Sequence, residues 1–177
     1  MPETIIRFFS FYTILTNILV AICFTALLVK PNSRWGIFFS QPGVLAATTI
    51  YITVVGVLYN LILRQLWSPV GYQRVADELL HVVTPLLFIL YWYLFAPKGG
   101  LGLKNALSWL IYPFVYAVFV LFRGTLSGFY PYPFIDANTL GFRKVLLNSV
   151  GLLIGFFLLS LLFIIITKAV NKTTVNT

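Results

Sequence analysis

The chain has 177 residues, of which 60% are hydrophobic and only 9% charged, and it carries a formal net charge of +8 with a mean hydropathy of +0.96. A soluble domain of this size has no interior large enough to bury so much apolar surface, so the composition excludes a soluble globular protein and predicts an integral membrane protein. The basic residues stand singly beside hydrophobic segments, where Lys and Arg anchor helix ends at lipid headgroups, and this distribution predicts no nucleic-acid partner.

Five hydrophobic segments follow one another along the chain, each long enough to cross roughly 30 Å of hydrocarbon as a helix. The first lacks the polar cleavage region of a signal peptide, so we expect it to be retained. The last contains Gly151 and Gly155, a GxxxG pattern typical of close helix packing. Because the apolar runs are continuous and not alternating, we predict an all-α integral membrane protein rather than a closed barrel. The prediction is one domain, residues 1–177, forming a bundle of five transmembrane helices at 8–29, 43–64, 77–95, 105–122 and 145–167.

The charges decide little about the orientation of this bundle in the membrane. In a five-span chain the N-terminus and the second and fourth connections lie on one side. The 12 Lys and Arg residues divide evenly between the two sides and give no positive-inside preference. The acidic residues all fall on the N-terminal side, and this asymmetry slightly favours a cytoplasmic C-terminus; they are Glu3, Asp77, Glu78 and Asp136.

The third span opens with ADELLHVVTP, residues 76–85, which holds two of the acids and the only histidine. Asp77 and His81 are four residues apart, so they share a helix face and the carboxylate can orient or charge the imidazole. Pro85 has no N–H to donate to the His81 carbonyl, which predicts a free carbonyl and a bend. Structural roles remain open: His81 can instead bond across a helix interface, and the two acids can simply form a solvated helix start.

Polar side chains of four spans are expected in one shallow layer at the N-terminal face. At 1.5 Å of rise per residue, Thr13 and His81 each lie roughly 6–8 Å below the boundary. For a threonine in such a helix the alternative is a bond to its own backbone, and for an arginine it is snorkelling to the interface. The same layer is expected to contain Thr16, Asn17, Arg64 and Arg123.

Four stretches of the chain resemble bacterial relatives of the androgen-induced gene family of membrane proteins. They are FFSFYTILTN (8–17), ILRQLW (62–67), LLHVVTP (79–85) and GFYPYPFID (128–136). The resemblance covers nearly the whole chain, and the spaced combination of Thr, His and Tyr-Pro-Phe-acid carries it. Members of this family are six-span proteins, so the resemblance implies that the usual first helix is missing here. It also implies a multi-pass protein of the bacterial cytoplasmic membrane.

Family members are described as threonine hydrolases that cleave fatty acid esters of hydroxy fatty acids. The resemblance implies that Thr13 is the nucleophile and His81 the base, and that the partners are a fatty-acyl ester substrate and membrane lipids. Such chemistry also needs an oxyanion donor, for which the sequence offers Asn17, Tyr130 or a backbone N–H. Asp77 could orient the base, and an arginine could hold a lipid carboxylate; the candidates are Arg64 and Arg123.

Residues that bind metals or haem are scarce. Cys23 is the only cysteine and lies inside a span, which excludes an internal disulfide and a cysteine-based metal site. A single histidine excludes a bis-histidine haem site. We therefore expect no cofactor.

Two other classes of function remain open on the sequence alone. A small transporter or channel would need polar residues that continue through the bilayer midplane, whereas here they gather at one side. A non-catalytic scaffold or lipid-binding protein would need only the fold. An acyl-sized internal cavity that opens from the polar layer would favour the hydrolase over both alternatives.

Overall fold

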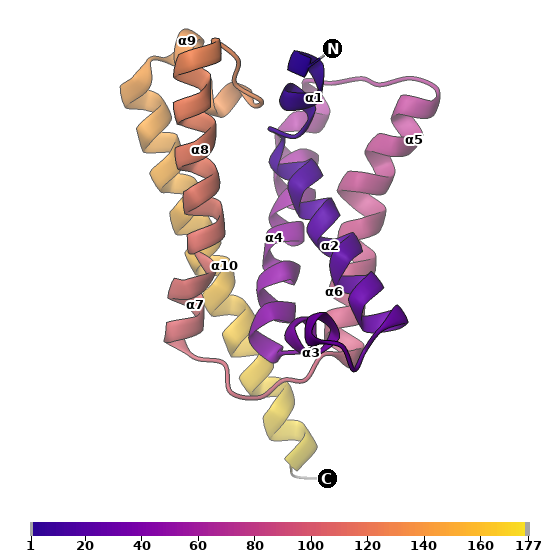
Figure 1. The fold of residues 1–177 in the computed structure, drawn as a ribbon. Helices are drawn as coiled ribbons and strands as arrows, with labels where there is room; N and C mark the ends of the chain where they lie inside the picture. The colour runs from indigo at the N-terminus through magenta and orange to yellow at the C-terminus, as the bar shows by residue number, and fades with distance from the viewer. Residues whose placement is uncertain (1, 176–177) are drawn as a thin grey trace.

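The chain folds into an antiparallel bundle of long helices, seen in a computed structural model that describes residues 2–175 and the side chains of residues 3–171 (Figure 1). No strand occurs within the described chain. Five helical segments are long and apolar enough to cross a membrane, which confirms the predicted all-α, multi-pass class. They are Tyr12–Val29, Pro42–Gln65, Tyr72–Phe95, Leu103–Ser127 and Phe142–Asn171.

Shorter helices and turns interrupt or cap these segments. In chain order the elements are α1 (Pro2–Phe8), α2 (Tyr12–Val29), α3 (Arg34–Phe39), α4 (Pro42–Leu61), η1 (Leu63–Gln65), α5 (Tyr72–Glu78), η2 (Leu79–Val83), α6 (Thr84–Phe95), α7 (Leu103–Trp109), α8 (Ile111–Ser127), η3 (Pro133–Ile135), α9 (Ala137–Leu140) and α10 (Phe142–Val175).

Helix α4 lies in the middle of the bundle, between α2 and α6 on one side and α8 and α10 on the other (Figure 1). It is the most buried span: 61% of its most apolar stretch is buried, against 17–33% in the other four. Small residues make this central position possible, because Ala and Thr let neighbouring backbones approach closely. Ala46, Thr48 and Thr49 are all almost fully buried.

Gly56 sets the closest approach of α4 to the segment that carries the histidine. A Cβ added at Gly56 would lie 3.2 Å from the His81 carbonyl oxygen and 3.2 Å from Pro85 Cβ. The GxxxG prediction for α10 is wrong within the described chain, because a Cβ at Gly151 or Gly155 would meet nothing within 4 Å. Close packing in this bundle therefore depends on α4 and not on the glycines of α10.

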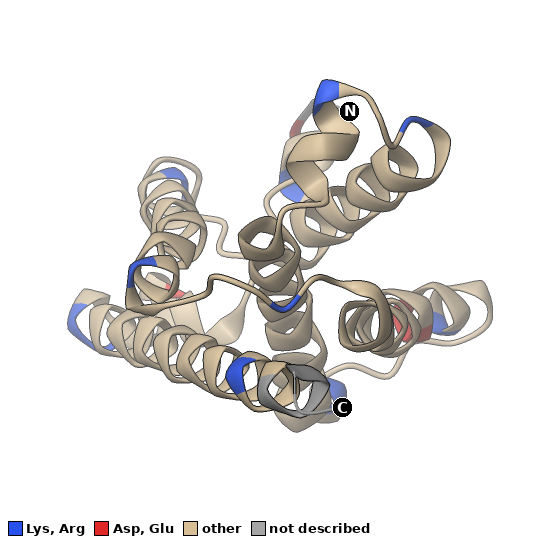
Figure 2. Cartoon of the chain, turned by 90° about the horizontal axis from the view of Figure 1, so that it is seen from below, with Lys and Arg blue, Asp and Glu red and all other residues tan. Residues whose placement is uncertain are grey.

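Charged residues lie near the ends of the helices and in the connections, so the middles of the spans are free of them (Figure 2). The outer faces of the spans carry exposed aliphatic and aromatic side chains, among them Leu86, Phe114 and Leu147. Exposed apolar side chains between charged ends are what hydrocarbon contact requires.

The predicted ends of four spans were wrong by several residues, and the fifth span covers Phe142–Asn171 and not 145–167. The first span begins at Tyr12 and not at residue 8, because Phe11 is extended (φ −78°, ψ 127°) and separates α1 from α2. The third begins at Tyr72 and not at residue 77, since polar residues at an interface continue a helix as readily as apolar ones. The fourth continues to Ser127 and not to residue 122, where Gly128 ends it in the left-handed conformation (φ 68°). Most of the predicted connection 123–144 is therefore helical.

Pro85 acts on the third span through the turn before it. The chain widens at Leu79–Val83 into a π-helix, in which the N–H of Thr84 bonds the carbonyl of Leu79. The His81 carbonyl, which Pro85 cannot serve, accepts a long 3.4 Å bond from Asn60 Nδ2. The prediction of a free carbonyl is wrong, and the helix is distorted by a π-helical turn at this point, while the predicted bend stays a prediction. Widened turns of this kind re-aim side chains, here His81.

We expect the substitution Gly56→Ala to destabilise the protein by about 1–3 kcal/mol, because the added methyl must displace the His81 carbonyl or Pro85. The matched control is Gly155→Ala, where the space is open and the helix gains up to about 1 kcal/mol from alanine. The measurement is the thermal midpoint of the purified chain in detergent. Equal midpoints for the two variants would show that the approach at Gly56 is not a constraint.

Candidate functional site

Thr13 and His81 face each other across the interior at the end of the bundle where the chain begins. Thr13 lies in the first turn of α2 and His81 in η2, and Thr13 Oγ1 is 3.3 Å from His81 Nε2. Both are shielded: Thr13 is 7% exposed and the His81 side chain 13%. The expected contact between Thr13 and His81 is present, but the positions from which their equal depth was estimated are wrong. Thr13 is the second residue of its span and His81 the tenth of its own.

The neighbours of His81 fix which ring nitrogen carries the proton. Its Nδ1 lies 2.9 Å from the backbone carbonyl oxygen of Asp77 and 3.2 Å from the Asp77 carboxylate. A carbonyl oxygen can only accept, so Nδ1 must be the donor. In the neutral ring Nε2 then has a free lone pair, and it points at the Thr13 hydroxyl. This is the tautomer that a general base requires.

Tyr59 contacts both His81 and Asp77, and no sequence pattern predicted this role. Its ring stacks on the imidazole at 3.9 Å between centroids and 14° between planes, and its hydroxyl donates to Asp77 Oδ2. Tyr59 comes from α4, so the imidazole is held between the carboxylate of its own helix and an aromatic ring of the central one. A tyrosine near a helix end has no local pattern that would link it to His81.

Tyr132 makes the second contact to the Thr13 hydroxyl. Its oxygen lies 3.3 Å from Thr13 Oγ1 and accepts the Thr13 backbone N–H at 3.2 Å. That N–H is one of the donors that the first turn of a helix leaves without an intrahelical acceptor. Burial raises the pKa of Tyr132 above its usual value, so the phenol stays protonated near neutral pH. The phenol can therefore donate a hydrogen bond at this point.

Tyr132, and not the predicted Tyr130, is the tyrosine of this segment that contacts Thr13. Tyr130 packs on α8, where a Cβ at Gly124 would lie 2.0 Å from its ring. Tyr132 instead stacks on Phe134 at 5.3 Å and meets the edge of Phe11. The two tyrosines are separated by Pro131 alone, and composition cannot decide which of them turns inward.

Asn17 positions the site and does not face the hydroxyl as an oxyanion donor. Its Nδ2 donates to the Thr13 carbonyl at 2.9 Å and to the Leu80 carbonyl at 3.3 Å. Both amide hydrogens are thereby used, and they tie α2 to η2. Thr16, one turn deeper than Thr13, points elsewhere, since its hydroxyl lies 3.4 Å from that of Tyr112.

Neither arginine proposed to hold a lipid carboxylate lines the two cavities beside Thr13. Arg64 does line a third hollow of about 300 Å³, which also includes Tyr59 and Asp77. The role of the arginines therefore stays a prediction. Arg64 pairs with Glu78 at 2.5 Å and lies over the ring of Tyr59 at 5.4 Å. Arg123 lies over Phe129 at 5.3 Å, where Arg7 approaches the same ring at 4.8 Å. Each guanidinium contacts an aromatic ring, an arrangement that cation–π attraction favours. Arg123 Nη1 is nevertheless buried and has no hydrogen-bond partner among the described residues.

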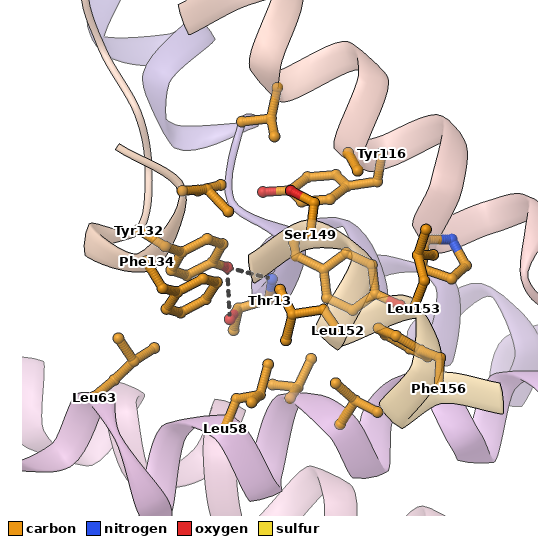
Figure 3. A pocket seen from close by; sticks show the side chains of 17 residues that line it. Thr13, Leu58, Leu63, Tyr116, Tyr132, Phe134, Ser149, Leu152, Leu153 and Phe156 are labelled. Atoms are coloured by element: carbon orange, nitrogen blue, oxygen red, sulfur yellow. Dashed lines mark hydrogen bonds between the residues drawn. The ribbon is translucent and has the colours of Figure 1, made fainter. Parts of the chain in front are cut away.

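Two cavities meet at Thr13. The larger, which we call the vestibule, has a volume of about 620 Å³ and includes the polar side chains of Gln73, Asp77 and His81 among apolar ones. The smaller, which we call the slot, has a volume of about 70 Å³ and runs between α4, α8 and α10 (Figure 3). Its lining is almost wholly apolar. Three residues line both cavities: Thr13, Leu63 and Tyr132.

Both cavities lie toward one end of the bundle. None of their lining residues comes from α3 or α7, the short helices at the opposite end (Figure 1). An internal space that opens from the polar layer is the feature that separates a lipid hydrolase from a plain scaffold.

Comparisons with protein-family models, with curated proteins and with solved structures found no match. The chemistry of the site is therefore read from its geometry. A hydroxyl, an imidazole with its lone pair toward that hydroxyl, a carboxylate behind the imidazole and a neutral phenol together have the composition of a nucleophilic acyl-transfer site.

We expect Asn17→Ala to lower stability by about 1–3 kcal/mol, because two interior carbonyls would lose their donor. The surface residue Asn138 provides the control: it donates to the Gly128 carbonyl from an exposed position, and its replacement by alanine should change stability by less than about 0.5 kcal/mol. The measurement is thermal unfolding in detergent. If both variants melt together, Asn17 does not join the two helices.

Proposed function

We propose that this chain is a membrane-embedded ester hydrolase in which Thr13 is the nucleophile and His81 the general base. The observation that carries the proposal is the aligned series from the Thr13 hydroxyl through the imidazole to Asp77, at the junction of two internal cavities. The resemblance to the androgen-induced gene family supports the same two residues. It also supports fatty acid esters of hydroxy fatty acids as the substrate class.

The first half of the reaction forms an acyl-enzyme. His81 Nε2 takes the proton of Thr13 as Oγ1 attacks the ester carbonyl carbon, and Asp77 holds the imidazole and stabilises its charged form. The carbonyl oxygen becomes an oxyanion, to which Tyr132 donates its phenolic hydrogen. Collapse of the tetrahedral intermediate breaks the bond to the alcohol oxygen, which leaves with the proton held on His81.

Water then completes the cycle. His81 removes a proton from a water molecule in the vestibule, and the hydroxide attacks the acyl-threonine carbonyl. The second intermediate collapses, the fatty acid leaves, and Thr13 recovers its proton. The low-dielectric surroundings strengthen each charge interaction in these steps.

We expect Thr13→Ala to abolish both hydrolysis of fatty-acyl esters and labelling by a fluorophosphonate probe, with a loss on the order of 10⁴-fold or more. Thr13→Ser keeps a hydroxyl and should retain part of both signals. Thr16→Ala is the control, because its hydroxyl faces Tyr112, and it should label normally. Labelling that persists in Thr13→Ala and vanishes in Thr16→Ala would identify Thr16 as the nucleophile. Labelling of both variants would refute a threonine hydrolase.

We expect Asp77→Asn to lower turnover without abolishing it, by at most about 10⁴-fold, because an amide no longer stabilises the imidazolium. Glu78→Gln is the matched control, since Glu78 pairs with Arg64 at the surface. The measurement is kcat across a pH series on one ester. Unchanged turnover and an unchanged pH profile in Asp77→Asn would show that this carboxylate has no role in catalysis and only begins the helix.

A further inference from the structure

The two cavities at Thr13 differ in which catalytic groups they contain. The vestibule includes His81 and Asp77, whereas neither residue lines the slot. Thr13 and Tyr132, which would hold the carbonyl carbon and its oxyanion, belong to both. The acyl and alcohol portions of an ester that reacts here must therefore lie in different cavities. The two cavities are not equivalent, because only the vestibule contains the proton donor His81.

The proton transfer to the leaving alcohol determines which portion of the ester lies in which cavity. The imidazolium formed in the first step must give its proton to the leaving alcohol oxygen, so that oxygen has to lie on the side of His81 Nε2. The acyl chain stays attached to Thr13 after the alcohol has left, and it has to extend away from His81. We propose that the ester binds in one direction only, with its acyl chain in the slot and its alcohol portion in the vestibule. This inference rests on the proposed function and adds the substrate preference of the same site.

The lining of the slot suits a single unbranched alkyl chain. Two of its polar groups are occupied: the Ser149 hydroxyl donates to the Val145 carbonyl at 2.9 Å, and the Tyr116 hydroxyl to the Ser10 carbonyl at 2.9 Å. The buried hydroxyl of Tyr12 has no hydrogen-bond partner among the described residues. Along α10 the slot runs from Ser149 to Phe156, which at 1.5 Å per residue is roughly 10 Å. Its volume of about 70 Å³ is well below the roughly 150 Å³ of a cavity that holds benzene, so the slot takes a short acyl chain of a few carbons. The acyl chain is thereby limited in both width and length.

The vestibule sets no comparable limit on the alcohol. Its volume of about 620 Å³ is far larger than that of the slot, and Gln73 and Trp67 add polar and aromatic contacts. It also contacts exposed side chains such as Leu66, so the alcohol portion can extend toward the membrane interface. The site is therefore selective for the acyl chain and tolerant of the alcohol.

The test uses Ser149→Phe, which fills the slot from α10 (Figure 3). The serine hydroxyl bonds only its own helix, so its loss removes no tie between helices. Ser108→Phe is the matched control, because Ser108 also bonds its own helix, is exposed and lines neither cavity. A second variant, Leu152→Ala, enlarges the slot and guards against a folding defect in the first.

The purified full-length chain in detergent is assayed on two ester series. One varies the acyl chain from acetate to dodecanoate on 4-methylumbelliferol, and the other varies the alcohol from ethanol to dodecanol on acetate. Each result is the ratio of kcat/KM for the four-carbon ester of a series to that for the shortest ester of the same series. Dividing the ratio of each variant by the wild-type ratio cancels the partition of the esters into micelles.

We expect Ser149→Phe to lower the acyl ratio by about tenfold or more and to leave the alcohol ratio unchanged. Leu152→Ala should shift the acyl preference to longer chains, and Ser108→Phe should change neither ratio. A fall in the alcohol ratio instead, or no change in either with activity intact, overturns the binding direction while the hydrolase stands. If the wild type cleaves no ester of either series and no probe labels Thr13, the proposed function itself fails and the inference falls with it.

Discussion

The site depends on how the chain satisfies the backbone carbonyls around His81 within a membrane-spanning helix. A proline four residues after His81 removes one N–H donor, and inside a membrane an unsatisfied carbonyl costs several kcal/mol. The π-helical turn at Leu79–Val83 and two asparagines compensate. Asn60 reaches the His81 carbonyl from α4, and Asn17 reaches the Leu80 carbonyl from α2. The same bonds that satisfy this segment therefore hold it between the two helices that supply the rest of the site.

The central helix makes these bonds possible. Gly56 lets the third span come close enough for Asn60 to reach His81, and Tyr59, three residues later on α4, stacks on the imidazole. The packing of α4 against η2 therefore determines the position of the His81 imidazole. A residue that widened the gap between α4 and η2 would move the base away from the Thr13 hydroxyl, even though it touched neither group.

The start of α2 adds an electrostatic element to the same place. Thr13 lies in a first turn, where backbone N–H groups have no intrahelical acceptors and the helix dipole is positive. Tyr132 accepts one of these N–H groups and is polarised toward donating its own hydrogen. The positive end of the helix and the neutral phenol would therefore both stabilise an anion that developed beside Thr13 in this low-dielectric environment.

The sequence by itself determined the number and type of the spans, because hydrocarbon demands long apolar helices and the composition leaves no other arrangement. It also determined that Asp77 and His81 share a face, since helical spacing is a local property. The contact of Thr13 with His81 was expected from depths that rested on wrong span starts, so the packing of the helices decided it. Only the tertiary structure decided that Tyr132 and not Tyr130 faces Thr13 and that Tyr59 stacks on the histidine. It also decided that Arg64 and Arg123 contact aromatic rings and line neither the slot nor the vestibule. Thr13 and Tyr132 are 119 positions apart. Contacts over such separations follow from how whole helices pack side by side, and no local periodicity encodes them.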